Sequence, residues 1–161
     1  MNAENSTGFR IFPLAPEHIA SLEALEEAAG LPFWGVDNYR RFLEEFSEYF
    51  GFCLISESGE KRLAGFSLAR SAFEDMELLK IGVAPEFQRY GFGTQLLNET
   101  ITEGGNRSCT RCFLEVRKSN QNAIQFYSTH GFQISGARVN YYSNPVEDAW
   151  IMERQLFNRF F

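Results

Sequence analysis

Two glycines lie where the chain passes from an expected strand into an expected helix, in the segment Gln88-Arg89-Tyr90-Gly91-Phe92-Gly93. The first turn of a helix presents unpaired backbone N–H groups and a partial positive charge, which together favour an anion such as a pyrophosphate. Gly91 and Gly93 let the backbone approach a ligand because neither carries a Cβ, and Arg89 adds a cation. A plain strand-to-helix connection has a similar composition, so the glycines alone leave both interpretations open.

Glu115 and Tyr127 are the residues whose types suit acid–base chemistry. Alternation along residues 111–117 places Glu115 among apolar residues, and its simplest role is an ion pair with Arg117 on the same face. Tyr127 lies on the apolar stripe of the next expected helix, where a core aromatic with a satisfied hydroxyl is the simplest interpretation. A carboxylate can also take a proton from an attacking amine, and a phenol can give one to a leaving group.

Larger motifs connect these residues. Residues 81–93 closely resemble the signature of the GNAT superfamily of N-acetyltransferases, a strand followed by Q/R-x-x-G-x-G/A. Residues 114–132 resemble the second conserved block of the bacterial ribosomal-protein-alanine N-acetyltransferases, and residues 140–142 and 147–152 resemble that family's C-terminal block. The resemblance runs from about Leu78 to Met152. It implies a GNAT fold, an α+β three-layer αβα sandwich around a mixed, centrally splayed β-sheet.

The resemblance also implies acetyl-CoA as the co-substrate and no metal. The loop amides would hold the pyrophosphate, the strand edge at residues 81–83 would pair with the pantetheine, and a backbone N–H near Val83 would stabilise the oxyanion. Glu115 corresponds to the general base and Tyr127 to the general acid beside the CoA sulfur. The implied cofactor-binding residues are Ile81, Gly82, Val83, Gln88, Arg89, Tyr90, Gly91, Phe92, Gly93, Thr94 and Asn120.

The acceptor is expected to be the N-terminal amine of a protein, with a ribosomal protein as the partner that the family name implies. Phe33, Trp34 and Tyr142 lie where that family binds its peptide, near the acidic pair Glu147-Asp148. An α-amine with a pKa of about 8 is roughly one-tenth neutral at pH 7, whereas a lysine is neutral at only about four parts in ten thousand, so a modest carboxylate base suits an N-terminus.

Two departures from the family fall on the acceptor side. Trp34 is followed by glycine where the family usually has Ser or Thr, and residues 143–146 form an atypical hairpin tip. Because of these two departures, a small-molecule amine such as a polyamine or an antibiotic stays an alternative acceptor. A non-enzymatic acetyl-CoA sensor is a further alternative, because a fold does not fix a function.

The elements that position these residues follow from hydrophobic periodicity and from turn residues. The expected order is β-α-α-β-β-β-α-β-α-β-β, with no repeat and no linker, which predicts one N-acetyltransferase domain over residues 1–161. The helix that opens at Gly91 is expected to end at Gly104-Gly105. The expected strands are 9–14, 52–55, 63–69, 76–83, 111–117, 132–137 and 149–157, and the other expected helices begin near residues 16, 36 and 120.

Composition sets outer limits on function. The 15 basic and 21 acidic residues give a net charge of −6, which argues against direct nucleic-acid binding. The polar N-terminus and the lack of a long apolar run predict a cytoplasmic protein that does not bind a membrane. Cys109-x-x-Cys112 lacks the further ligands that zinc needs. His130 lies in the last turn of its helix, where its charge is expected to complement the helix dipole. No G-x-S-x-G motif supports a serine nucleophile. The 17 Phe are expected mainly to fill the core.

Overall fold

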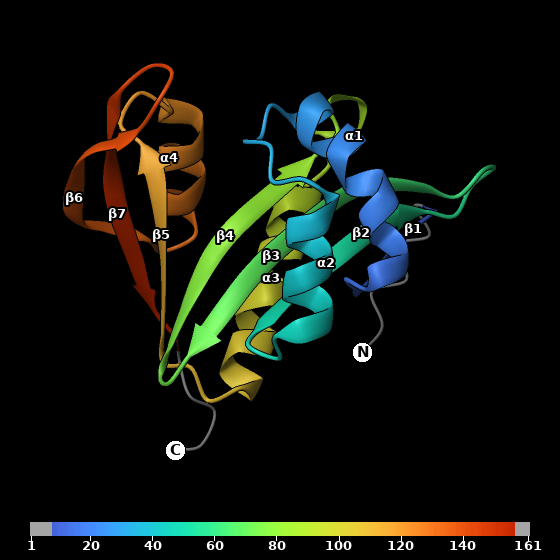
Figure 1. Ribbon diagram of the computed structural model, residues 1–161, viewed down its shortest axis with the longest axis horizontal. Coiled ribbons are helices and arrows are strands. Elements are labelled where there is room, and N and C mark those ends of the chain that lie inside the picture. Colours follow the sequence, from blue (N-terminus) through green and yellow to red (C-terminus); the bar gives the residue numbers. More distant parts are fainter. Residues whose placement is uncertain (1–7, 157–161) are drawn as a thin grey trace. The chain divides into compact units, whose positions relative to one another are not determined.

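The computed structural model describes residues 8–156, so the terminal segments 1–7 and 157–161, including the expected strand end at Phe157, lie outside the described residues. Strands and helices follow one another in the predicted order (Figure 1). The strands are β1 (Phe9–Pro13), β2 (Tyr49–Ser56), β3 (Arg62–Ala72), β4 (Asp75–Val83), β5 (Arg111–Arg117), β6 (Gln133–Tyr142) and β7 (Glu147–Gln155). The helices are α1 (Ile19–Ala29), α2 (Val36–Glu45), α3 (Phe92–Asn106) and α4 (Gln121–Thr129), with short 3-10 turns η1 (Pro16–His18) and η2 (Pro85–Phe87).

The strands belong to one mixed sheet in the order β1-β2-β3-β4-β5-β7-β6. β1 and β2 are antiparallel, whereas β4 and β5 are parallel. The chain divides into two compact units: the first comprises residues 1–69 and 80–102, and the second comprises residues 70–79 and 103–161.

In the first unit, helices cover both faces of the strands: α1 and α2 lie on one side and α3 on the other (Figure 1). Two glycines permit this close packing. A Cβ on Gly65 would lie 3.2 Å from Leu96 of α3, and a Cβ on Gly82 would lie 2.7 Å from Leu31, which follows α1. The predicted three-layer arrangement is therefore present, and its core includes Leu54, Ala64, Val83, Phe92 and Leu96.

In the second unit, β5 is the strand that carries the candidate base. It pairs with β7 along its whole length, from Arg111 to Arg117, but with β4 only over residues 111–113. Cys112, Leu114 and Val116 are buried on one face, so alternation turns Glu115 to the other face, as predicted. β6 forms the edge beside β7 and contains register shifts, which are typical of sheet edges.

Several boundaries differ from the prediction by a few residues, and two of these differences affect the packing and the candidate site. α3 continues through Gly104-Gly105 to Asn106, because Gly104 is needed for packing rather than for termination: a Cβ there would lie 2.1 Å from the sulfur of Met76. β6 continues past residue 137 to Tyr142, and this longer strand carries Arg138 and Tyr141 beside the candidate base.

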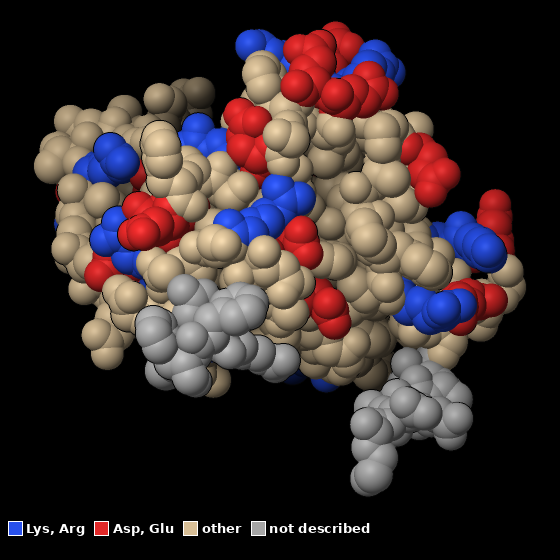
Figure 2. All heavy atoms as spheres, turned by 90° about the horizontal axis from the view of Figure 1, so that it is seen from below, with Lys and Arg blue, Asp and Glu red and all other residues tan. Residues whose placement is uncertain are grey.

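Charged side chains of both signs are interspersed on the face drawn in Figure 2, where Lys and Arg groups lie next to Asp and Glu groups. Ion pairs among the described residues include Arg10 with Glu57 and Arg62 with Glu86. Within residues 8–156, no helix combines the length and the apolar character needed to cross a bilayer.

Candidate active site

The candidate anion loop lies in the first unit, between η2 and α3. Gln88 Nε2 donates to the carbonyl oxygen of Val83 at 2.9 Å, which ties the loop to the end of β4. Arg89 and Gly91 have left-handed φ angles of 69° and 81°, and the Gln95 N–H donates to the Gly91 carbonyl at the start of the helix. A Cβ on Gly91 would meet nothing within 4 Å, so the backbone at the helix start is open to a ligand.

The side chains of the loop divide into two kinds. Phe92 is buried and packs on Phe9 with ring centres 4.7 Å apart, which fixes the helix start in the core. Tyr90 is exposed, as are Gln88 and Arg89. Phe92 is therefore suited to offer its backbone rather than its ring, whereas Arg89 and Tyr90 have side chains that a ligand can reach.

The candidate base Glu115 is held by the neighbouring edge strand rather than by its own strand. Its Oε1 accepts from Arg138 Nε at 2.6 Å, with the carboxyl side chain only 10% exposed and the arginine side chain 52% exposed. The Tyr141 hydroxyl also donates to Glu115, which raises the pKa of Tyr141 to about 12. The alternative that we predicted, an ion pair between Glu115 and Arg117, is wrong, because Arg117 pairs with Glu147 at 3.3 Å.

A second carboxylate, Glu77 of β4, shares this environment. Glu77 is opposite Phe113 in the parallel pairing, which puts it on the same sheet face as Glu115. Burial raises the pKa of Glu77, the charge of Glu115 raises it further, and Arg70, at 3.2 Å, opposes the shift. Glu77 was not predicted as a site residue, although a glutamate between Met76 and Leu78 in an apolar strand is a usable signal in the sequence.

Tyr127 of α4 has the protonation state that a general acid needs. Burial raises its pKa above the ordinary value of about 10, and Cys112 and Tyr142 contribute smaller electrostatic effects in the same direction. The pKa of Tyr142 is itself raised by burial and then by Glu115. Tyr142 is therefore an electrostatic neighbour of both Glu115 and Tyr127, and the second unit brings these three predicted residues together.

Helix α4 is fixed at both ends by polar side chains. Asn120 Oδ1 accepts from the Ala123 N–H at 3.2 Å as the N-cap, while His130 Nδ1 lies 2.7 Å from the Phe126 carbonyl oxygen at the C-terminal end. His130 thus has the structural role that we predicted. Asn120 positions the helix that carries Tyr127, and its cofactor contact stays a prediction.

The predicted acceptor residues occur in both units. Phe33 and Trp34 lie between α1 and α2 in the first unit, and Phe33 is 73% exposed. Tyr142 ends β6 in the second unit, where Arg117 lies over its ring at 4.4 Å. The acidic pair 147–148 beside Tyr142 is already occupied by groups of the chain itself, including the Ser119 N–H, the Asn140 N–H and Lys118.

The cysteines are free and buried. Burial raises the pKa of the Cys112 thiol to about 12 and that of Cys53 to about 11, so neither resembles an activated nucleophile. Within the part of the chain that the structure describes, no group of three or more His, Cys, Asp or Glu residues is arranged to hold a metal ion.

Residues 19–132 match the model of the acetyltransferase (GNAT) family. The chain belongs to that family. This match covers more than half of the chain and includes residues of both units, and it confirms the family and the fold that we predicted from the loop and the second conserved block.

Similar proteins include enzymes named as ribosomal-protein alanine N-acetyltransferases. Over 97 residues the chain is 38% identical to the ribosomal protein bS18-alanine N-acetyltransferase of Salmonella typhimurium, an alignment that covers 59% of this chain and 66% of the relative, just under two thirds. The crystal structure of the ribosomal-protein-S18-alanine N-acetyltransferase from Escherichia coli has a TM-score of 0.80 at 29% identity, covering 92% of this GNAT chain and 94% of that one. A nourseothricin acetyltransferase structure has a TM-score of 0.74 at 22% identity over 94% of this chain and 100% of that one, which shows a shared fold alone.

Proposed function

We propose that this protein is an acetyl-CoA-dependent N-acetyltransferase that acetylates the N-terminal α-amine of a protein, with both units serving one catalytic domain. The observation that carries the proposal is the acid–base arrangement of the second unit, in which Tyr142 neighbours both a largely buried carboxylate and a protonated phenol. The relatives named for alanine acetylation of ribosomal protein bS18 support a protein N-terminus as the acceptor, and a ribosomal protein as the first partner to test.

Acetyl-CoA supplies the acetyl thioester when it is bound. The open helix start at Gly91 suits its pyrophosphate, because two left-handed residues turn the backbone there and no Cβ obstructs it. Arg89 adds an exposed cation, and the strand edge at residues 81–83 offers backbone groups that can pair with the amides of an extended ligand. Asn120 is the remaining proposed contact.

The chain's own residues would move two protons. An ammonium cannot attack a thioester, so Glu115, directly or through a water, accepts one proton from the acceptor before the new C–N bond forms. Tyr127 donates its hydroxyl proton to the thiolate that leaves when the C–S bond breaks, and it is suited to do so because burial keeps it protonated. Arg138 and Tyr141 hold the carboxylate of Glu115 in place.

A small-molecule amine is the second candidate acceptor. The glycine after Trp34 and the hairpin tip at residues 143–146 depart from the N-terminal acetyltransferase pattern on the acceptor side. Enzymes of the same fold that act on other acceptors include the nourseothricin acetyltransferase, so the fold does not separate the two candidates.

A CoA-release assay tests the proposal directly. The panel contains peptides that begin with Ala, Ser or Met, the same peptides blocked by N-terminal acetylation, a polyamine and an aminoglycoside. We expect release above background with free N-terminal Ala or Ser and none with the blocked peptides. Release with the small amines and not with any peptide would overturn the choice of acceptor, and binding of acetyl-CoA without any release would favour the sensor.

A further inference from the structure

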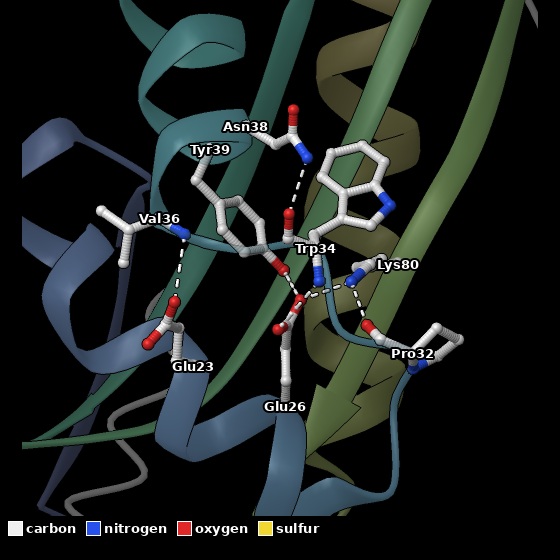
Figure 3. A network of polar contacts seen from close by, with 8 residues as sticks. All are labelled: Glu23, Glu26, Pro32, Trp34, Val36, Asn38, Tyr39 and Lys80. Carbon is white, nitrogen blue, oxygen red and sulfur yellow. Dashed lines mark hydrogen bonds and ion pairs between the residues drawn. The ribbon is translucent and has the colours of Figure 1, made fainter.

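A buried cluster of charged and polar groups lies in the first unit (Figure 3), whereas the acid–base residues belong to the second. Glu26 of α1 is 1% exposed and Lys80 of β4 is 5% exposed. Lys80 Nζ and the Tyr39 hydroxyl of α2 both donate to Glu26 Oε1. Three elements of the first unit therefore meet at one carboxylate.

Such a pair is not the usual way to stabilise a core. Removing two charges from water costs more free energy than a typical surface ion pair contributes to stability. Well-packed apolar residues of similar size often stabilise a core equally well. Burial lowers the pKa of Lys80, an effect that the hydrogen bond and the charge of Glu26 oppose. The arrangement thus calls for an explanation other than stability.

The cluster also binds the connection between α1 and α2, residues 30–35. Lys80 Nζ donates to the Pro32 carbonyl oxygen, and the backbone N–H of Trp34 donates to Glu26 Oε2 at 3.3 Å. The ammonium group of Lys80 also lies 4.9 Å from the centre of the Trp34 ring. Figure 3 shows the Trp34 indole and the Pro32 carbonyl on either side of this ammonium.

Further hydrogen bonds hold the connection on both sides of these contacts. Asn38 Nδ2 donates to the Trp34 carbonyl at 2.7 Å, and the Val36 N–H donates to Glu23 Oε1 at 3.2 Å. The Leu31 N–H donates to the Glu26 carbonyl at 2.9 Å. Phe33, between two held residues, extends an aromatic ring that is 73% exposed. An exposed aromatic ring on a fixed backbone is typical of a preorganised binding contact.

We propose that the Glu26–Lys80 pair, with Tyr39, positions the Pro32–Trp34 segment so that Phe33 binds an apolar side chain of the acceptor polypeptide. This inference rests on the proposed function and adds specificity-determining residues to it. Glu26, Lys80 and Tyr39 are positioning residues that act through Phe33. Their loss weakens acceptor binding in the ground state and the transition state alike, which raises the acceptor KM and leaves kcat and the acetyl-CoA KM unchanged.

The main test replaces the pair by apolar residues in the double variant Glu26→Leu/Lys80→Met, which keeps the core filled and leaves no unpaired buried charge. Its matched control is Arg10→Met/Glu57→Leu, which removes an exposed ion pair of the same unit. We expect the acceptor KM of the first variant to rise about tenfold, with a lower Tm than the wild type because the buried Tyr39 hydroxyl loses its acceptor. The control should keep the wild-type KM for both substrates.

A second measurement separates positioning from general stability. Trp34 and Trp150 are the two tryptophans, so a Trp150→Phe background leaves Trp34 as the only reporter. In that background, acrylamide should quench Trp34 emission more strongly when Glu26→Leu/Lys80→Met is added. When the control Arg10→Met/Glu57→Leu is added instead, the quenching should equal that of the Trp150→Phe protein. Unchanged quenching together with an unchanged acceptor KM would overturn the inference.

Phe33→Ala completes the test. It should raise the acceptor KM in the wild type without changing the quenching of Trp34, and it should add nothing in Glu26→Leu/Lys80→Met, because the segment is then no longer positioned. Equal effects of Phe33→Ala in both backgrounds would mean that Phe33 acts independently of the pair, which contradicts the proposal. A wild type that acetylates small amines and no peptide contradicts the proposed function instead, and the inference then fails in its choice of acceptor whatever the quenching shows.

Discussion

Two ion pairs of this protein have the same chemical form and opposite surroundings. The Lys80–Glu26 pair of the first unit is almost wholly buried, and both oxygens of its carboxylate accept hydrogen bonds from the chain. The Arg138–Glu115 pair of the second unit combines a nearly buried carboxylate with an arginine that is half exposed. A carboxylate saturated by internal donors can only hold structure, whereas one whose partner borders solvent can exchange that partner for a substrate.

The two carboxylates, Glu26 and Glu115, therefore have different roles. Glu26 binds a lysine, a tyrosine and a backbone N–H from three other segments, so its function is to fix positions. Glu115 is held by Arg138 and Tyr141 on one edge strand, and a second carboxylate, Glu77, lies on the same sheet face. Each of these two carboxylates is paired with an arginine, Glu115 with Arg138 and Glu77 with Arg70.

The largest effect is expected from Glu115→Gln, which removes the proposed base and keeps the size of the side chain. We expect kcat/KM to fall by about a hundred- to ten-thousand-fold, with little change in Tm because Arg138 can turn to solvent. Tyr127→Phe should give a loss in the same range. Steady-state kinetics and thermal unfolding measure both, and a variant that retains more than a tenth of the activity would remove that residue from the mechanism.

The next prediction concerns stability and compares the two pairs directly. Lys80→Met leaves a buried, unpaired carboxylate and should cost about 3–5 kcal/mol of unfolding free energy. Arg138→Met breaks a partly exposed pair and should cost less than about 1 kcal/mol. Urea denaturation of both variants measures the difference, and equal losses would show that burial does not distinguish the pairs.

The order of elements followed from the sequence because alternation and turn residues are local signals. The roles of the anion loop and of the acid–base residues also have local signals, a glycine turn and motifs at fixed spacing, and they stay predictions. The helix end at Gly104 was wrong because the same residue type serves both termination and close packing, and only the structure shows the sulfur of Met76 against it. The partner of Glu115 was wrong because Arg138 comes from a strand whose length the sequence did not reveal.

The sequence indicates the two members of the Lys80–Glu26 pair but not their pairing. Lys80 follows Met76 and Leu78 on the inward side of β4, and Glu26 follows Leu22 by one helical turn on the buried stripe of α1. Each is therefore a charge at a core position. Their pairing spans 54 residues of sequence, so no local pattern could identify one as the partner of the other.

Glu77→Gln tests the electrostatics around Glu115 with a smaller effect. Because burial and Glu115 raise the pKa of Glu77 above 4.5, the folded state binds its proton more tightly than the unfolded state. Stability therefore falls as the pH rises from the unfolded pKa through the folded one, and glutamine removes that loss. The variant should have a higher Tm at pH 7 and an equal Tm near pH 4. A lower Tm at pH 7 would show that the Arg70 pair outweighs the burial of charge.

The smallest effect is expected from Glu147→Gln, at the hairpin between β6 and β7. Hydrogen bonds from Ser119, together with Arg117, lower the pKa of Glu147 below 4.5. Its stabilisation is therefore present above the unfolded pKa and is lost as the pH falls through the lower, folded pKa. Faster hydrogen exchange of the Ser119 amide, which donates to Glu147 at 2.7 Å, should appear in the variant at neutral pH and vanish in acid.

Glu57→Gln, which affects an exposed pair of the first unit, is the control and should leave the Ser119 amide unchanged. The acceptor KM of Glu147→Gln should equal that of the wild type, because Ser119 and Arg117 already occupy both carboxylate oxygens. A raised acceptor KM with unchanged exchange would instead show that Glu147 contacts the acceptor, which contradicts the structural role expected for it.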